Sequence, residues 1–350
     1  MKILSFGAGA IGTYIGGSLA LAGHELVFIE TPQAVEYLQT LGLKLNLGLD
    51  ERRKGQAEFQ LQRPTVHFCS SIEEALNHGP FDVAIFALKS FDTQAALEGM
   101  RSYAGSLPPV LCLQNGIDNE PAIAGLLGEG KVIYGTVTSA VGRRGIGDII
   151  LEKLRGVGVG AGHPLSERLV EALDGAFLNA KLFAKPADMK WSKMLTNLLA
   201  NPTSAILNMT AAEVFAHDGL YRLEIDQLSE CLAVMKAHGI GVVDLPGTPV
   251  RALALATRLP TWLSKPFLSK AAGAGRGAKM PSFHIDLHSG RGKSEISYLH
   301  GAVVRAGQKA GVPTPVSRLL TETLLAMTAG ELPLDAFSHQ PEKLLNRLGK

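Results

Sequence analysis

The feature that most constrains this chain is a glycine-rich turn placed directly after its first apolar run. Residues 3–6 read Ile-Leu-Ser-Phe, and the turn that follows opens a stretch of small and apolar residues. In a strand–turn–helix unit, the first glycine of G-x-G-x-x-G permits a tight turn, the second lets the backbone approach a pyrophosphate, and the third lets the helix pack closely on the strand. Phosphates are favoured at the helix N-terminus. We therefore expect a dinucleotide-binding turn made of Gly7, Ala8, Gly9, Ala10, Ile11 and Gly12.

An acidic residue ends the next expected strand, at residues 25–29. Glu30 stands close to the distance from the turn at which a carboxylate meets the adenosine ribose. A carboxylate there accepts hydrogen bonds from both ribose hydroxyls and repels a 2′-phosphate, which favours NADH over NADPH. Two alternatives remain open: Glu30 is only a surface charge at a strand end, or Thr31 or Gln33 receives a phosphate while the glutamate turns away.

Short apolar runs alternate with helix-like segments in the first half of the chain. The expected strands are residues 3–6, 25–29, 83–88, 110–113 and 132–136. Runs of this length joined by crossovers indicate a parallel sheet buried on both faces. Residues 148–152 and 157–159 are interpreted as a pair of extra strands, residues 165–177 as a helix and residues 180–183 as a strand. The prediction is an α/β Rossmann-type dinucleotide-binding domain over residues 1–184.

Helical patterns dominate the second half, after Pro186. They cover residues 189–199, 220–238, 295–311 and 316–328 and predict an all-helical C-terminal domain over residues 185–350 that binds substrate and carries catalysis. Residues 247–279, rich in Gly, Pro and Ala with a basic bias, are interpreted as helix fragments joined by a mobile loop. Two domains are the natural expectation for 350 residues.

Composition excludes several classes of protein. Apolar residues make up 46% and charged residues 19% of the chain, which is ordinary for a globular protein. The formal net charge is only +2 and the basic residues are scattered, so neither a nucleic-acid surface nor a polybasic membrane surface is expected. The three cysteines show no metal or disulfide spacing, and His284 and His288 lack a ligand set, so no metal site is expected. With no signal-peptide or membrane-helix pattern, we expect a cytoplasmic protein.

Polar residues recur on one face of the first helix of the second half. Lys193, Asn197 and Asn201 are spaced every four residues, so on a helix they form a single stripe among apolar neighbours. A solvent-exposed face is the alternative, but Asn is a poor helix former and solvent faces seldom use two of them. Lys89 and Asn115 follow expected strands, at the edge where open α/β sheets bind ligands. A surface lysine and a turn-forming Asn-Gly are the competing interpretations.

Several segments, taken in order, resemble the ketopantoate reductase (2-dehydropantoate 2-reductase) family over nearly the whole chain. They are residues 87–90 (Ala-Leu-Lys-Ser), 113–116 (Leu-Gln-Asn-Gly), 191–197 (Trp-Ser-Lys-Met-Leu-Thr-Asn), Asn201-Pro202, Ser282 and residues 293–296 (Lys-Ser-Glu-Ile). The resemblance implies that Lys193 is the general acid and that Glu295 binds the substrate and takes part in catalysis. It implies substrate-binding roles for Asn115, Asn197, Asn201 and Ser282, and places Lys89 and Asn115 on the nicotinamide side of the cofactor.

The activity that this resemblance implies is reduction of 2-dehydropantoate to pantoate, a step of pantothenate biosynthesis, by NADH or NADPH. Three departures from the family pattern bear on this activity. Glu30 replaces an arginine that is common in the family for the NADP phosphate, which bears on the choice of cofactor. Lys279 stands where Asn is frequent and Ala211 stands near another expected Asn, which leaves room for another branched 2-oxo acid. A non-catalytic dinucleotide sensor is a further alternative, against which a proton-donating lysine argues. A small-molecule 2-oxo acid is the expected partner, and a homodimer is possible for such a helical domain.

Overall fold

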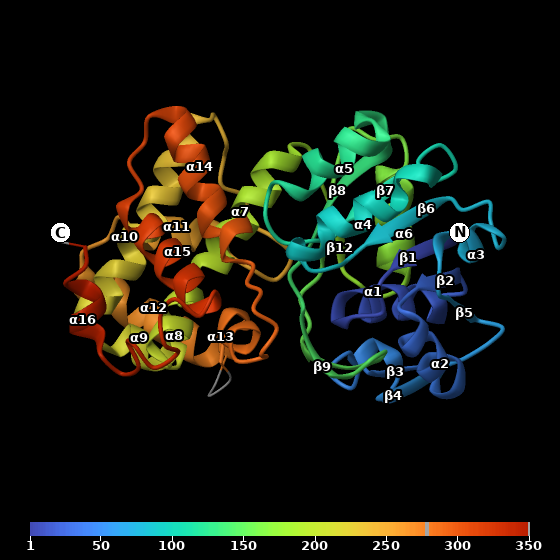
Figure 1. Ribbon diagram of the computed structural model, residues 1–350, viewed down its shortest axis with the longest axis horizontal. Helices are drawn as coiled ribbons and strands as arrows, with labels where there is room; N and C mark the ends of the chain where they lie inside the picture. Colours follow the sequence, from blue (N-terminus) through green and yellow to red (C-terminus); the bar gives the residue numbers. More distant parts are fainter. Residues whose placement is uncertain (277–279, 349–350) are drawn as a thin grey trace. The chain divides into compact units, whose positions relative to one another are not determined.

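The computed structural model describes residues 1–276 and 280–348. They divide into two compact units, each treated by itself below (Figure 1). Unit 1 contains Met1–Lys190 and the short segment Leu245–Thr248, and unit 2 contains Trp191–Asp244 and Pro249–Lys350. The division therefore falls after Lys190 rather than after residue 184, and unit 1 includes one segment from the second half of the chain.

Unit 1 is built on an eight-stranded sheet in the order β12-β11-β8-β7-β6-β1-β2-β5. Six neighbouring strands are parallel, and the expected parallel sheet is confirmed. These six are β1 (Lys2–Phe6), β2 (Glu25–Ile29), β5 (Val66–Cys69), β6 (Val83–Phe86), β7 (Val110–Cys112) and β8 (Val132–Val137). The last two, β11 (Val157–Gly160) and β12 (Ala180–Phe183), run antiparallel to the rest. Strand β5, only four residues long, was not predicted.

Both faces of this sheet are covered, which explains why its strands have no polar alternation. Neighbouring residues of one strand belong to different hydrophobic clusters: Ile85 lies in one and Phe86 in the other. Helices α1 (Ala10–Leu21), α2 (Pro32–Leu41) and α6 (Ser166–Gly175) contribute to the first cluster. Helices α3 (Ile72–Leu76), α4 (Thr93–Met100) and α5 (Asn119–Leu127) contribute to the second.

A second, four-stranded sheet lies beside the first, in the order β4-β3-β10-β9. Its strands are β3 (Leu43–Asn46), β4 (Glu58–Leu61), β9 (Ala140–Gly145) and β10 (Asp148–Lys153). The two extra strands expected at residues 148–152 and 157–159 are present as β10 and β11, but they belong to different sheets: β10 pairs with β3 and β9, whereas β11 pairs with β8 and β12. The burial of the two strands agrees with this. Strand β11 is buried at every residue, as expected inside the main sheet, whereas residues of β10 alternate between buried and more exposed, as expected in a sheet with one open face.

Unit 2 is helical, as predicted. Its elements after α7 (Pro186–Leu198) are α8 (Asn201–Leu207), α9 (Ala211–Ala216), α10 (Asp218–Ala237), α11 (Val250–Ala256), α12 (Thr261–Arg276), α13 (Ser282–Leu287), α14 (His300–Ala310), α15 (Pro315–Thr328) and α16 (Pro341–Leu345). Residues 247–279, interpreted as helix fragments joined by a mobile loop, contain α11 and the longer helix α12, while Lys279 lies outside the described residues. In the described part of the chain, no helix combines the length and apolarity needed to cross a membrane.

The segment Leu245–Thr248 completes unit 1. Thr138, just after β8, donates its hydroxyl proton to the carbonyl oxygens of Gly156 at 3.0 Å and Pro246 at 2.8 Å. Gly247 lies against the stem of Arg155, and a Cβ at position 247 would come within 2.9 Å of the Arg155 Cβ and Cγ atoms. Gly247 also has a φ of +59°, a conformation that glycine adopts most easily. Both the contact with Arg155 and the positive φ therefore disfavour any side chain at position 247.

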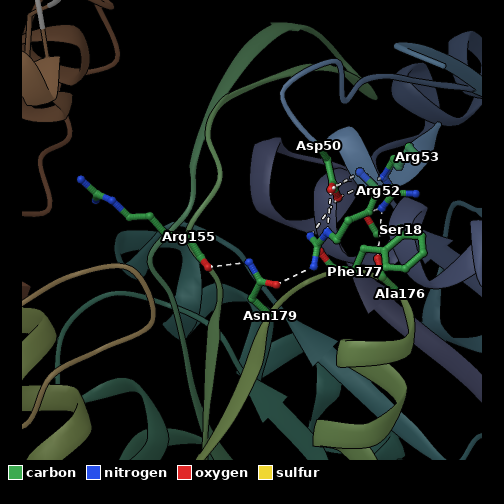
Figure 2. Close-up of polar contacts among 8 residues, drawn as sticks. All are labelled: Ser18, Asp50, Arg52, Arg53, Arg155, Ala176, Phe177 and Asn179. Atoms are coloured by element: carbon green, nitrogen blue, oxygen red, sulfur yellow. Dashed lines mark hydrogen bonds and ion pairs between the residues drawn. The ribbon is translucent and has the colours of Figure 1, made fainter. Parts of the chain in front are cut away.

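An ionic cluster in unit 1 joins the β3–β4 connection to the loop before β12 (Figure 2). The Asp50 carboxylate is 3% exposed and lies 2.7 Å from Arg52 Nε and 3.5 Å from Arg53 Nε. Arg52 donates to the Phe177 carbonyl oxygen and to Asn179 Oδ1, each at 2.6 Å. Burial lowers the pKa of Arg53, whose guanidinium donates to the Ala176 carbonyl oxygen at 3.0 Å. One carboxylate thus orients two cations that together hold residues 176–179.

We predict that Asp50→Ala lowers the free energy of unfolding by about 3 kcal/mol, because it leaves Arg53 buried without its counter-charge. Urea unfolding followed by circular dichroism measures the change. Glu98→Ala is the matched control, since it breaks an ion pair with Arg101 whose side chains are both 64% exposed, and it should leave the midpoint close to the parent's. Equal midpoints for Asp50→Ala and the parent would show that the cluster does not stabilise the fold.

Candidate active site

The turn between β1 and α1 has the geometry that a dinucleotide pyrophosphate requires. Gly7 adopts a φ of +94° and donates its N–H to the Ile29 carbonyl oxygen at 3.0 Å. A Cβ at Gly12 would lie 2.1 Å from the Gly7 carbonyl oxygen, so only glycine lets α1 approach this closely. A Cβ at Gly9 would have no described atom within 4 Å, and no side chain caps the N-terminus of α1 there. Open space beside the first amide groups of a helix fits a bound phosphate.

Glu30 directs its carboxylate at this turn. Its Oε1 accepts a hydrogen bond from the Ala8 N–H at 2.6 Å, and its Oε2 accepts one from the Thr31 N–H at 3.3 Å. The side chain is half-buried. Two main-chain donors therefore hold the carboxylate beside the glycine turn rather than away from it, which is the orientation that the interpretation of Glu30 requires.

Lys89 and Asn115 follow β6 and β7, which are parallel neighbours, so both residues lie at the carboxyl edge of the sheet. Hydrogen bonds tie the two loops together. Gln114 Nε2 donates to the Leu88 carbonyl oxygen at 3.0 Å, and Ser90 Oγ donates to the Asn115 carbonyl oxygen at 3.2 Å. Buried Asn119 donates to that same Asn115 oxygen at 2.7 Å. The main chain at Asn115 is thus fixed from two directions.

A buried ion pair behind these loops was not anticipated from the sequence. Lys190 in α7 and Glu120 in α5 are 3% and 0% exposed, with 2.7 Å between Nζ and Oε1. Lys190 also donates to the carbonyl oxygens of Gln114 at 2.6 Å and Gly135 at 3.2 Å. Three acceptors therefore surround this ammonium group. The available signal was a lysine placed between two large apolar residues, Met189 and Trp191.

Unit 2 contains the expected polar residues, but on two helices instead of one. Helix α7 ends at Leu198, Ala200 has a φ of +52°, and Asn201 begins α8. The prediction of a single stripe through Lys193, Asn197 and Asn201 is therefore wrong in its last member. Pro202 explains the break: it lacks the N–H that a continuous helix would bond to the Leu198 carbonyl oxygen, and its ring would collide with that carbonyl, so it is accommodated in the first turn of a new helix.

Asn201 and Ser282 come together although they are 81 residues apart in the chain. Asn201 Nδ2 donates to Ser282 Oγ at 3.3 Å and to the Asn197 carbonyl oxygen at 3.2 Å. Asn201 Oδ1 accepts a hydrogen bond from the Phe283 N–H at 3.1 Å. One buried amide therefore joins the end of α7 to the first residues of α13.

Glu295 is 4% exposed and precedes a 3₁₀ turn, Ile296–Tyr298. The expected single helix from residue 295 to 311 is therefore interrupted: α14 begins only at His300. The N–H groups of Tyr298 and Leu299 bond to the Glu295 carbonyl oxygen at 3.0 and 3.2 Å, which closes the turn. This tight turn fixes the backbone of Glu295 immediately before the helix.

A glycine turn for a pyrophosphate, polar loops at the carboxyl edge of a parallel sheet and a helical second unit define a dinucleotide-dependent oxidoreductase. Residues 3–163 match the family model described as "Ketopantoate reductase PanE/ApbA", and residues 187–328 match its C-terminal model. The chain belongs to the ketopantoate reductase family, a family of NAD(P)-dependent oxidoreductases.

Individual relatives are distant but extend over most of the chain. A 2-dehydropantoate 2-reductase of Streptococcus pyogenes is 25% identical, with 94% of this chain and 98% of the relative covered. Another, from Mesorhizobium japonicum, is 27% identical, with 90% and 94% covered. A PanE/ApbA family ketopantoate reductase from Ralstonia eutropha superimposes with a TM-score of 0.76 at 26% identity, covering 95% and 99%. D-mandelate dehydrogenase, solved with NADH and anilino(oxo)acetate, shares the fold at 23% identity and a TM-score of 0.74, covering 94% and 99%.

Two glycine substitutions should separate binding from folding. Gly9→Ala meets open space, so it should leave the melting temperature nearly unchanged while lowering affinity for NADH about tenfold, because its methyl group occupies the approach of the pyrophosphate. Gly12→Ala should lower the melting temperature, because the methyl group collides with the Gly7 carbonyl. Thermal unfolding and NADH fluorescence titration measure the two effects. Unchanged affinity in Gly9→Ala would move the pyrophosphate away from this turn.

Proposed function

We propose that this protein reduces a 2-oxo acid with a nicotinamide cofactor, and that its substrate is 2-dehydropantoate, which it converts to pantoate. Membership of the family over both halves of the chain supports the reaction type. The observation that carries the proposal is the Asn201–Ser282 contact, which assembles polar residues at the ends of α7, α8 and α13. These are residues for which the family resemblance implies a substrate-binding role.

Lys193 is the proposed proton donor. When bound, the reduced nicotinamide supplies a hydride to the substrate carbonyl carbon. Lys193 carries a proton on Nζ, stabilises the negative charge that develops on the carbonyl oxygen and transfers the proton to it. The neighbouring lysine of the same helix, Lys190, is unsuited to this role because its ammonium group is 3% exposed and committed to Glu120 and two carbonyl oxygens.

The remaining polar residues orient the substrate in this proposal. Asn115 and Asn197 bind it directly, and Ser282 contacts it with the hydroxyl group that Asn201 holds in place. Glu295 accepts a hydrogen bond from a substrate hydroxyl, which in 2-dehydropantoate is the terminal one. Asn201 is itself buried and hydrogen-bonded to protein groups through both amide atoms, so it acts mainly by positioning.

A second candidate substrate is a different branched or aromatic 2-oxo acid. The fold is shared with D-mandelate dehydrogenase, whose structure was solved with anilino(oxo)acetate. A panel of 2-oxo acids offered with NADH and with NADPH tests both substrates and the reaction type. Fastest turnover of 2-dehydropantoate supports the proposal, preference for another acid replaces the substrate, and no turnover of any acid would favour a dinucleotide sensor.

Replacement of Lys193 by alanine should lower kcat by about two to four orders of magnitude, the range expected when a positioned proton donor with an electrostatic role is lost. The dissociation constant for NADH should change less than about threefold. Lys185→Ala is the control, because Lys185 is an exposed lysine just before the same helix. Steady-state rates under saturating cofactor measure the loss. If Lys193→Ala turns over within a few-fold of the parent, another group donates the proton.

NADH is the proposed cofactor in preference to NADPH. A 2′-phosphate beside the Glu30 carboxylate would meet like-charge repulsion, and at an effective dielectric constant near 20 this corresponds to about a hundredfold in affinity. Two main-chain donors, the N–H groups of Ala8 and Thr31, already hold that carboxylate at the turn. The carboxylate therefore has a fixed position from which to exclude the phosphate.

The ratio of kcat/KM for NADH to that for NADPH, measured with one fixed 2-oxo acid, tests this preference. The parent should favour NADH, and Glu30→Arg should shift the ratio toward NADPH by about a hundredfold. Glu36→Arg makes the same change of charge at an exposed position of α2 and should leave the ratio within about twofold. A parent that prefers NADPH, with a ratio unmoved by Glu30→Arg, would place Glu30 outside the ribose site.

A further inference from the structure

A carboxylate buried in unit 2 stabilises the break between α7 and α8. Glu224 of α10 is 0% exposed, and its two oxygens accept hydrogen bonds from the Ala200 N–H at 2.7 Å and from Thr203 Oγ1 at 2.6 Å. Ala200 has a φ of +52°, which an alanine adopts only when its surroundings impose it. Because Glu224 accepts the Ala200 N–H, it fixes the residue immediately before Asn201.

This carboxylate is the first member of a buried hydrogen-bonded chain. Gln227, also 0% exposed, donates its Nε2 to Glu224, so its Oε1 must face the other way. There it contacts His300 Nε2 at 2.9 Å. Since Oε1 can only accept, His300 carries its proton on Nε2. Burial lowers the pKa of His300 to about 3, so the ring is neutral at physiological pH.

The hydrogen-bonded series Glu224–Gln227–His300 connects the two parts of unit 2 that contain proposed substrate-binding residues. One end holds Ala200, and therefore Asn201 with its hydrogen bonds to Ser282 and Phe283. The other end is His300, the first residue of α14, which follows the turn closed on the Glu295 carbonyl oxygen. The ring of Phe283 also lies against that of His300, with 6.0 Å between centroids. No described residue bonds to His300 Nδ1, so the ring is held through Nε2.

We propose that Glu224, Gln227 and His300 are positioning residues that set the spacing between Asn201–Ser282 and Glu295, and thereby the length of 2-oxo acid that the enzyme accepts. This inference rests on the proposed function. Each hydrogen bond in this buried network has a fixed donor and a fixed acceptor, so the network favours one geometry, whereas apolar packing of the same volume would tolerate several. These three side chains therefore favour one arrangement of the starts of α8 and α14, in addition to any effect on stability.

His300→Phe tests the proposal, since it removes the Nε2 donor and keeps an aromatic ring. We expect KM for the 2-oxo acid to rise about tenfold and the preference among acids of different chain length to weaken, while the dissociation constant for NADH stays within about twofold. His300→Gln restores an N–H donor and should bring KM back to within about threefold of the parent. His238→Phe is the matched control: His238 Nε2 joins the far end of α10 to the Ala306 carbonyl oxygen at 3.1 Å.

Two results would overturn the positioning role. One is a His300→Phe enzyme with a lower melting temperature but the parent's KM and chain-length preference. The other is an equal loss in His238→Phe. If His300→Phe does not fold, the comparison of His300→Gln with Gln227→Leu replaces it, and the proposal fails if both keep the parent's KM.

A measurement without turnover separates this inference from the proposed function. In ¹⁵N spectra of the free protein, His300 should be the Nε2-protonated tautomer and should not titrate between pH 5 and pH 9. In His300→Phe, amide hydrogen exchange should accelerate together at residues 199–203 and 295–300 and stay unchanged in α16. A different tautomer, or independent exchange rates in the two segments, would refute the coupling through Glu224, Gln227 and His300 even in an active enzyme. If these results are obtained but no 2-oxo acid is reduced, the proposed function fails, whereas the coupling of residues 199–203 and 295–300 through the three side chains is supported.

Discussion

The approach of α1 to the turn before it leaves no room for a side chain at position 12, where a Cβ would lie 2.1 Å from the Gly7 carbonyl oxygen. The rest of unit 1 depends on this contact. It sets the first helix directly over β1, which brings the amide groups of the turn to the carboxyl edge of the sheet. Glu30, Lys89 and Asn115 follow β2, β6 and β7 at that same edge. This steric constraint thus places the glycine turn at the same edge of the sheet as these three candidate residues.

Local pattern was enough to predict the central strands, because a segment buried on both faces must be apolar throughout. Seven of the eight strands of the main sheet were predicted, five of them in this way, together with the helical second half. The pattern failed for β5 and for β3, β4 and β9 of the four-stranded sheet, which are short or carry charges such as Arg143 and Arg144 in β9. Strands like these are stabilised by partners far away in sequence, so their pairing leaves little trace in any single segment.

The candidate site was predictable to the same degree. Motif order placed Lys193, Asn197 and Asn201 in one region, but the prediction of a common helix was wrong because Pro202 fits only the first turn of a helix. Lys190, Glu224 and His300 were missed altogether. Each is an ordinary residue in sequence, and only the fold shows that it is buried, with acceptors or donors supplied by distant elements. Burial of a polar group is a tertiary property, and sequence periodicity carries no record of its partner.

The return of Leu245–Thr248 to unit 1 has a consequence for how the chain is made. A ribosome releases all of Trp191–Asp244 before it supplies Pro246, whose carbonyl oxygen accepts the Thr138 hydroxyl proton, and Gly247, which covers the stem of Arg155. The dinucleotide-binding half therefore emerges first but is finished late, although N-terminal domains usually fold first during synthesis. Until then Thr138 at the end of β8 lacks its Pro246 acceptor, so the first part of the helical unit, Trp191–Asp244, must be synthesised before the sheet unit can be completed.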